Sequence, residues 1–255
     1  MFMSGRVLEV QRLSEGFFRI LIKLLDKPLH RPAPFQFMMI WVPRKDLMPM
    51  SVSDYDKDLL SIVFKIRGEG TRELSRNPGF VGVNGFYGRG FKFSSKNPRI
   101  LFVAGGSGIA PLPYLARDAS EIDGEITVIW GVRRRSELFN LEKLASYRSI
   151  RRIYYAAEDY GSEYVYRGTA LDLYRELYQE DEWDLIIGSG PREMLKKLCL
   201  NSRSRERIYL NLEAYMKCGI GFCGSCVLKP KPLRLCVEGP LIRCDEVVEH
   251  LEQEG

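Results

Sequence analysis

Long apolar segments are absent from this sequence of 255 residues. The longest one runs from Ile100 to Ala116 and is interrupted by three glycines and two prolines, so it is too short and too broken to cross a bilayer. Residues Met1–Glu9 contain no apolar run behind a basic start, so we expect neither a signal peptide nor a membrane partner. Together these absences predict a cytoplasmic protein.

Histidine and clustered charge are scarce as well. The two histidines, His30 and His250, are not spaced to complete a zinc finger. There are 38 Lys and Arg against 33 Asp and Glu, a net charge of +5, and the basic residues are scattered. Because no basic stripe is interleaved with aromatic residues, we expect no nucleic-acid partner. The 45% of hydrophobic residues is enough for a sizeable core.

The order of apolar and turn-forming segments predicts a multi-domain β plus α/β protein. Short strands at Phe17–Ile22, Phe37–Val42 and Leu59–Ile66, separated by Pro, Gly and Asp, predict an antiparallel β-barrel over residues 1–97. From 98 to 206, strands alternate with helical stretches, which predicts a parallel-sheet α/β domain. We expect its strands near 100–104, 126–130, 152–156 and 185–187, and its helices from about 112, over 138–147 and 170–178, and up to 200. Residues 207–255 form a glycine- and cysteine-rich tail.

Cysteines carry the strongest chemical signal. Of the six in the chain, five lie in its last fifth: Cys218, Cys223, Cys226, Cys236 and Cys244. Disulfide frameworks are typical of short secreted chains, so clustered cysteines here indicate a metal. The C-x4-C-x2-C spacing of the first three is that of a plant-type [2Fe–2S] cluster. A zinc site would need a second close pair, and simple structural thiols are the third alternative.

The loop around these cysteines is suited to wrapping a cluster. Its glycines permit positive φ and let backbone N–H groups approach the sulfurs: Gly219, Gly221 and Gly224. Spacing alone leaves the fourth ligand open between Cys236 and Cys244. Cys199 lies in an expected helix with an apolar side, and we predict that it is a buried structural cysteine.

Two glycine-rich turns follow strands of the predicted parallel sheet. The first comprises Gly105, Gly106, Ser107, Gly108, Ile109, Ala110 and Pro111, and the second runs from Gly188 through Ser189 and Gly190 to Pro191. Glycine in such a turn lets a diphosphate lie against backbone amides at a helix start. Because the first turn does not have the G-x-G-x-x-G pattern, a tight structural turn is the alternative for it. Two turns on one sheet favour nucleotide binding.

The barrel and these two turns resemble the ferredoxin–NADP reductase superfamily. With the cysteine motif, the stretches Glu213–Gly219 and Leu235–Pro240 resemble the electron-transfer subunit of dihydroorotate dehydrogenase. The resemblance implies that electrons pass from an FMN-containing catalytic subunit through [2Fe–2S] to FAD, and then as hydride to NAD, within a heterotetramer. It also implies that Cys236, which precedes an acidic-Gly-Pro triplet, is the fourth cluster ligand.

The same resemblance implies the flavin contacts. The family's Arg-Pro-x-Ser matches Met48, Pro49, Met50 and Ser51, its next flavin segment matches Val63, Phe64 and Lys65, and its G-x-G-T ends on Gly70 and Thr71. Arg133 matches a strand end beside the cofactor's ribose. Methionine at position 48 cannot supply the charge-assisted contact that an arginine gives the FAD diphosphate. FAD binding would then depend on Lys65 and backbone amides. The alternative for residues 48–51 is a plain barrel strand without a flavin contact.

Two rival functions follow from the same residues. One is the flavin and iron–sulfur subunit of a hydrogenase or of a ferredoxin-dependent NAD(P) oxidoreductase. The other is a flavin-free adaptor that relays single electrons. It is suggested by Met48, which replaces the arginine of the family's flavin site. NAD and NADP remain alternatives, since Arg133 and Arg134 suit either a 2′-phosphate or water. In every case the chain positions cofactors, and we expect no catalytic acid or base.

Overall fold

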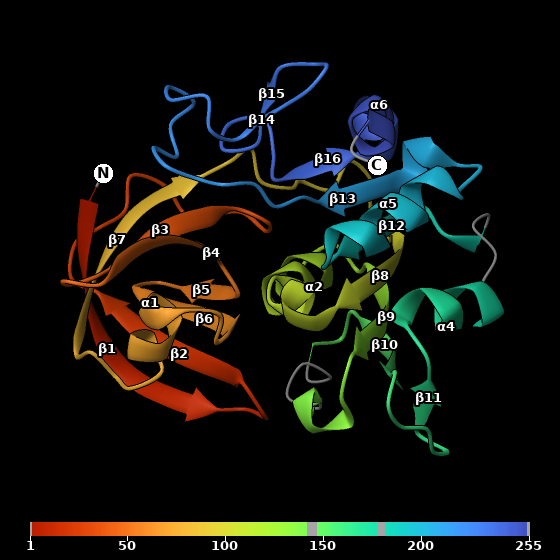
Figure 1. The fold of residues 1–255 in the computed structure, drawn as a ribbon, viewed down its shortest axis with the longest axis horizontal. Helices are drawn as coiled ribbons and strands as arrows, with labels where there is room; N and C mark the ends of the chain where they lie inside the picture. The colour runs from red at the N-terminus through yellow and green to blue at the C-terminus, as the bar shows by residue number, and fades with distance from the viewer. Residues whose placement is uncertain (1, 142–146, 178–181, 254–255) are drawn as a thin grey trace.

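The computed structural model describes residues 2–141, 147–177 and 182–253. Two seven-stranded sheets stand next to each other, and the cysteine-containing loops extend across one end of both (Figure 1). None of the described helices combines the length and apolar character needed to span a bilayer.

The N-terminal sheet is antiparallel throughout, in the order β4-β3-β7-β1-β2-β6-β5. Its elements are β1 (Phe2–Arg12), β2 (Phe17–Leu24), β3 (Phe37–Val42), β4 (Asp46–Ser51), β5 (Asp54–Asp56), β6 (Leu59–Lys65), α1 (Glu69–Leu74) and β7 (Phe80–Tyr87). Alternating residues such as Ile20, Ile22 and Leu24 point into one apolar core. The edge strands β4 and β5 do not pair with each other, so the predicted barrel is an open half-barrel within the described residues.

The second sheet has the order β11-β10-β9-β8-β12-β13-β16. Its strands are β8 (Arg99–Gly105), β9 (Glu125–Val132), β10 (Ile150–Ala157), β11 (Val165–Arg167), β12 (Leu185–Ser189), β13 (Ile208–Asn211) and β16 (Leu241–Arg243). The four predicted strands are confirmed as β8, β9, β10 and β12, and their neighbours are parallel. The last strand, β16, is antiparallel to β13, so the sheet is mixed rather than purely parallel.

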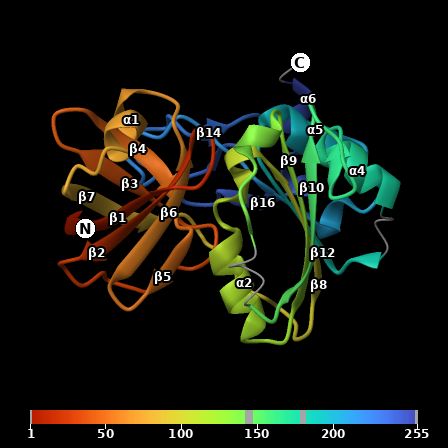
Figure 2. The ribbon, with the colours of Figure 1, turned by 90° about the horizontal axis from the view of Figure 1, so that it is seen from below.

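Helices cover both faces of this mixed sheet. On β8, Ile100 and Phe102 pack with α2 (Leu112–Ser120), whereas Leu101 and Val103 face the core shared by α4 (Ala170–Leu177), α5 (Arg192–Leu200) and α6 (Cys244–Gln253). Burial on both faces explains the continuous apolar run of this strand. Figure 2 shows α2 between the half-barrel and the mixed sheet. There Arg117 of α2 forms an ion pair with Asp54 of β5 (2.6 Å).

The structure departs from the sequence-based expectations in two further places. Residues 138–141, the start of an expected helix, have no regular structure, and positions 142–146 of that prediction lie outside the described residues. In the tail beyond 206, the segments β13, β16 and α6 belong to the mixed sheet and its helical layer. These short segments could not be foreseen, since β13 and β16 are only four and three residues long.

Candidate functional site

The cysteine loop is an insertion between two paired strands. It covers residues 212–240, from the end of β13 to the start of β16, and the Leu212 amide donates to the Pro240 carbonyl (2.9 Å) where the loop closes. Its one regular piece is the hairpin of β14 (Val227–Leu228) and β15 (Leu233–Arg234). The Gly88 amide, just after β7, donates to the Cys236 carbonyl (3.0 Å). The loop is therefore held between the mixed sheet and the half-barrel.

The four predicted cluster cysteines lie in this loop as two pairs. The sulfurs of Cys226 and Cys236, both buried, are 3.2 Å apart. The Cys223 amide donates to the Cys218 sulfur (3.4 Å), which places those two residues together. Among the described residues, no three Cys, His or acidic side chains converge as the ligands of a single ion would. Two pairs of thiols suit a two-iron cluster, with two sulfurs for each iron, better than one zinc ion.

The glycines of the loop have the conformation that the sequence predicts. Gly219, Gly221 and Gly224 have φ of 72°, 78° and 73°. A Cβ on Gly219 would lie 2.7 Å from the Tyr87 ring, so a larger residue would push the loop away from β7. The Gly221 amide donates to the Cys236 sulfur (3.1 Å). Such N–H···S bonds stabilise thiolate charge, and they help to set the reduction potential of a cluster.

The thiols differ strongly in acidity. Hydrogen bonds with Ser225 and with backbone groups lower the pKa of the exposed Cys223 to about 6. Burial, followed by the neighbouring Cys226, raises the pKa of Cys236 to about 12. Because the thiolate is the form that ligates iron, the lowered pKa of Cys223 favours its binding of the metal.

The other two cysteines form a disulfide. Cys199 of α5 is bonded to Cys244 at the start of α6, and both are fully buried. The prediction of a buried structural cysteine at 199 is confirmed, but the clustered cysteines gave no sign of a disulfide. With Cys244 bonded to Cys199, Cys236 is the candidate fourth ligand within the loop.

A cavity of about 540 Å³ lies at the carboxyl ends of β8, β9 and β12, where open α/β sheets bind their ligands. Of the residues singled out in the sequence, Lys65, Gly105, Gly106, Arg133 and Pro191 line it. Gly106 has φ of 52° and nothing within 4 Å of the position of a Cβ. Its backbone is therefore open to a phosphate group, and these residues fit a dinucleotide.

The remaining glycines of the two turns have a packing role. A Cβ on Gly108 would lie 2.0 Å from the Ser189 carbonyl oxygen, and one on Gly190 would lie 2.8 Å from the Gly105 amide nitrogen. The two turns thus pack directly against each other. Pro111, the last predicted residue of the first turn, is the N-cap of α2. The structural explanation therefore holds for Gly108 and Gly190, while Gly106 faces the cavity.

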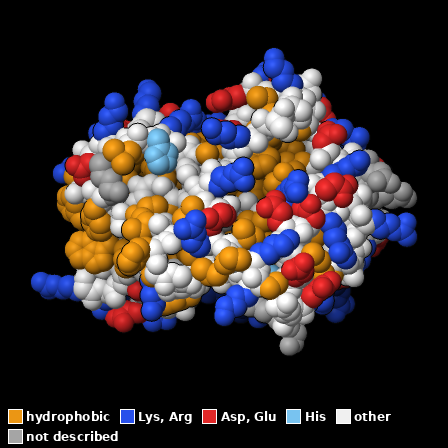
Figure 3. All heavy atoms as spheres, turned by 90° about the horizontal axis from the view of Figure 1, so that it is seen from above, with side chains coloured by type: hydrophobic (Ala, Val, Ile, Leu, Met, Phe, Trp, Pro, Cys, Tyr) orange, Lys and Arg blue, Asp and Glu red, His pale blue; other side chains and the backbone are white. Residues whose placement is uncertain are grey.

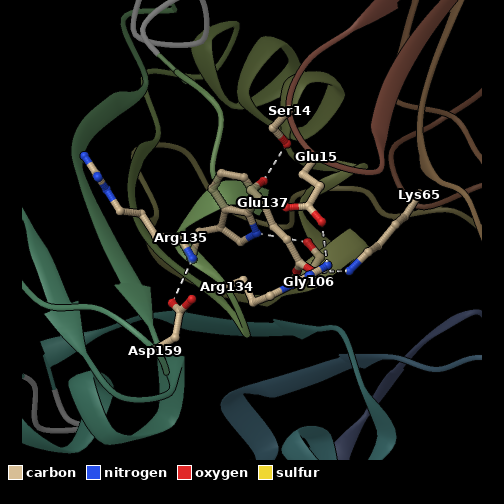
Figure 4. A network of polar contacts seen from close by, with 9 residues as sticks. Ser14, Glu15, Lys65, Gly106, Arg134, Arg135, Glu137 and Asp159 are labelled. Carbon is tan, nitrogen blue, oxygen red and sulfur yellow. Dashed lines mark hydrogen bonds and ion pairs between the residues drawn. The ribbon is translucent and has the colours of Figure 1, made fainter.

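A network of polar contacts joins the half-barrel to the mixed sheet (Figure 4), and its residues Lys65, Gly106 and Glu137 also line this cavity. Lys65 of β6 forms an ion pair with Glu137 (2.7 Å), whose side chain is 5% exposed. Arg134 forms an ion pair with Glu15 (2.9 Å), and the Ser14 hydroxyl donates to the Glu137 carbonyl (2.6 Å). On the sheet side, the Trp130 indole donates to the Gly106 carbonyl (2.9 Å). The network fixes the half-barrel edge relative to the glycine turn.

Several residues of the cavity were missed in the sequence. These are the following charged residues in the cavity lining: Arg67, Glu137, Glu158, Asp172, Arg175, Glu193 and Lys197. Glu158 directly follows β10, so its place after a parallel strand was a usable signal. The others come from helices or loops that approach only in the fold, and nothing local in the sequence marks them.

The predicted flavin segments are brought together at one end of the half-barrel. Residues 48–51 lie on the edge strand β4, Val63 and Phe64 lie on β6 beside Lys65, and β4 contacts both β6 and α1. Met48 and Met50 pack against the half-barrel core, whereas Pro49 is exposed. The Thr71 hydroxyl accepts from the Arg67 and Gly68 amides (2.9 and 3.0 Å), so it closes its own turn. At position 48 the methionine side chain gives a diphosphate no cation.

Comparison with known proteins identifies related domains in both parts of the site. Residues 213–248 match the iron–sulfur cluster binding domain of dihydroorotate dehydrogenase B, and residues 102–199 match the oxidoreductase NAD-binding domain. A probable dihydroorotate dehydrogenase B (NAD(+)), electron transfer subunit, of Archaeoglobus fulgidus is 32% identical over 95% of this chain and 97% of its own length. The corresponding subunit of Caldanaerobacter subterraneus is 30% identical over 96% of this chain and 98% of its own.

Solved structures show the same fold. A chain of an NADH-dependent reduced ferredoxin-NADP oxidoreductase, studied for flavin-based electron bifurcation, superposes with a TM-score of 0.80 at 25% identity, covering 98% of this chain and 93% of that one. The ferredoxin reductase of carbazole 1,9a-dioxygenase superposes with a TM-score of 0.71 at 17% identity, over 82% of this chain and 68% of its own, and shows the fold alone.

Proposed function

Because the chain belongs to the family of dihydroorotate dehydrogenase B electron-transfer subunits, we propose that it carries electrons from dihydroorotate oxidation to NAD. The catalytic partner in this proposal is an FMN-containing subunit. The cofactors of this chain are a [2Fe–2S] cluster, FAD and NAD. The observation that carries the proposal is the paired-cysteine loop between the half-barrel and a sheet with an open glycine turn.

The chain's residues have positioning roles in this transfer. A [2Fe–2S] cluster supplies one-electron transfer, and a flavin links it to the two-electron hydride chemistry of NAD. Cys218, Cys223, Cys226 and Cys236 would hold the cluster. Gly106, Arg133 and the cavity around them would hold the nucleotide. The network of Lys65 and Glu137 keeps the half-barrel and the nucleotide cavity in register.

Apolar side chains beside the cluster loop support a protein partner at this end of the molecule. Phe222 is 89% exposed, Tyr215 is 73% exposed and Ile220 is also exposed, around an exposed Cys223. Large exposed apolar side chains of this kind mark interaction sites. Across the face seen from above, Lys and Arg are interspersed with Asp and Glu rather than gathered in a stripe (Figure 3). We propose that the catalytic subunit docks on this rim, in a cytoplasmic heterotetramer.

The test is reconstitution with a dihydroorotate dehydrogenase catalytic subunit. We expect the two proteins to co-purify, and dihydroorotate to reduce NAD to NADH only when both are present. In each turnover, dihydroorotate loses two electrons and two protons, while NAD accepts two electrons and one proton. A chain that fails to bind this subunit, or a complex that leaves NAD oxidised, would overturn the proposal.

The rivals predict different results in the same preparation. A subunit of a hydrogenase or of a ferredoxin-dependent oxidoreductase would co-purify with a nickel–iron or ferredoxin-linked protein from its own cells. A flavin-free relay would contain iron and sulfide without any acid-released flavin. Substituting NADP for NAD in the coupled assay separates the two nucleotides.

A further inference from the structure

The space beside Gly70, in the first turn of α1, is filled by the neighbouring strand. A Cβ on Gly70 would lie 2.7 Å from the Asp46 Cβ and 2.8 Å from the Met48 Cε. Both residues belong to β4, which contacts α1 and lies beside it in Figures 1 and 2. In the flavin site of the proposed function, this glycine would let a phosphate approach the backbone. Here the Cβ side of this glycine is occupied by two side chains of the protein itself.

The charges around this space are unfavourable to a phosphate as well. The Asp46 carboxylate lies 3.0 Å from the position of the Gly70 Cβ, and its hydrogen bond is with the adjacent Leu47 amide (2.8 Å). The lysine beside it, Lys45, is paired with Glu69 (2.6 Å). Lys65, the cation on β6, is paired with Glu137. The nearest lysines are thus neutralised, and Asp46 adds a negative charge without an ion-pair partner among the described residues.

We propose that this chain binds its flavin through the ring system and gives the FAD diphosphate almost no binding energy. The inference rests on the flavin of the proposed function. Protein sites normally hold a diphosphate with charge-assisted hydrogen bonds and open backbone amides. Met48 supplies no charge, and Asp46 repels the phosphates. FAD therefore binds scarcely more tightly than riboflavin, which has the same ring but neither the diphosphate nor the adenosine, and it exchanges with free flavin.

The test compares FAD with riboflavin on the purified full-length chain, by quenching of flavin fluorescence. For the wild type we expect the two dissociation constants to agree within about threefold, a difference of roughly 0.7 kcal/mol. In the double variant Asp46→Asn/Met48→Arg, the FAD affinity should rise about tenfold or more, because a new charge-assisted contact forms. The riboflavin affinity should change little. Absorbance of the cluster reports that each variant is folded.

Leu47→Arg is the matched control. Leu47 lies between the two substituted positions, and its side chain is 41% exposed. Successive side chains of a strand point to opposite faces, so this variant adds the same charge on the other face. We expect it to leave the ratio of FAD to riboflavin affinity unchanged.

Three results would overturn the inference. One is a wild-type chain that binds FAD about a hundredfold more tightly than riboflavin. Another is a double variant with an unchanged ratio. The third is an Arg67→Gln variant that loses FAD affinity alone, which would show that Arg67 holds the diphosphate. Any of these, with NADH still formed from dihydroorotate, leaves the proposed function standing. A chain that binds neither flavin would refute both.

Discussion

Each cysteine of the loop has its own environment, and single substitutions should separate their roles. Cys226→Ser removes a buried sulfur 3.2 Å from Cys236, so we expect loss of the cluster's visible absorbance together with its iron and sulfide. Cys244→Ser should retain the cluster, because Cys244 is bonded to Cys199. Iron and labile sulfide counts check both variants. Loss of the cluster in Cys244→Ser, with retention in Cys236→Ser, would contradict the assigned fourth ligand.

A half-buried carboxylate on α2 should make stability depend on pH. Burial, followed by the neighbouring Glu121, raises the pKa of Asp118 from 3.8 to about 6. The folded state then binds the proton more tightly than the unfolded state, so this group's contribution is full below about pH 4 and is lost as the pH rises through 6. Asp118→Asn should therefore stabilise the protein at pH 7.5 by about 1–2 kcal/mol, after allowance for partial exposure.

The measurement for Asp118→Asn is the apparent melting temperature at pH 7.5 and pH 5. The advantage of the variant should be smaller at pH 5, where the wild-type carboxyl is mostly protonated. Asp56→Asn, at an exposed position on β5, serves as the control and should show no such change. An equal gain for Asp118→Asn at both pH values would contradict the assignment.

Residue chemistry was predictable from the sequence where a few neighbours determine it. The spacing of Cys218, Cys223 and Cys226 and the positive φ of the loop glycines follow from local geometry. The contact of Asp46 with Gly70 joins residues 24 apart, and their sequence neighbours carry no sign of it. The sequence showed that Met48 lacks a charge, and the structure adds that its side chain occupies the space itself.

At the scale of elements, the disulfide between α5 and α6 should stabilise the C-terminal layer. It closes a sequence separation of 45 residues, for which the loss of denatured-state entropy corresponds to about 2–4 kcal/mol. The variant Cys199→Ala/Cys244→Ala should therefore melt at a lower temperature than the wild type. A thiol reductant should lower the wild-type melting temperature and leave the double variant unaffected. A wild type insensitive to reductant, although mass spectrometry shows its thiols free, would refute this role.

Elements with a strong apolar pattern were predictable, and weakly patterned ones were not. The continuous apolar run of β8 and the alternation in β2 mark them as strands. β7 contains Gly82, and a Cβ at this position would lie 2.4 Å from the Phe2 ring. The glycine therefore leaves room for this aromatic ring and does not form a turn. A glycine in a short segment usually indicates the end of a strand, so the sequence alone did not predict β7.

For the whole molecule, the exposed rim of the cluster loop should control partner binding. Phe222→Ser removes an 89% exposed aromatic side chain without disturbing the core, so we expect an intact cluster and about tenfold weaker binding to the catalytic subunit. Leu29→Ser is the control, since Leu29 is 81% exposed and lies in the half-barrel part of the chain. Titration calorimetry gives both affinities. Equal affinities for Phe222→Ser and the wild type would show that the catalytic subunit docks on another surface.

The order of domains was predictable because each has its own periodicity, but the assembly was not. The pairing of β13 with β12 joins chain segments about 20 residues apart. Whether β4 and β5 meet depends on the curvature of the whole sheet, because they are its two edge strands. The comparisons confirm the family inferred from the motifs, while the fold explains how one chain brings the three sites together.

The two ends of the cysteine loop meet on adjacent strands, where Asn211 pairs with Leu241. Its 29 residues are thus one insertion whose ends pair in the β13–β16 ladder, while its side chains Met216, Leu228 and Leu235 pack in the core that α5 and α6 share. Replacing 212–240 with a short β-turn should therefore keep the pairing of β13 with β16 but open this core, so we expect loss of the cluster together with a lower melting temperature.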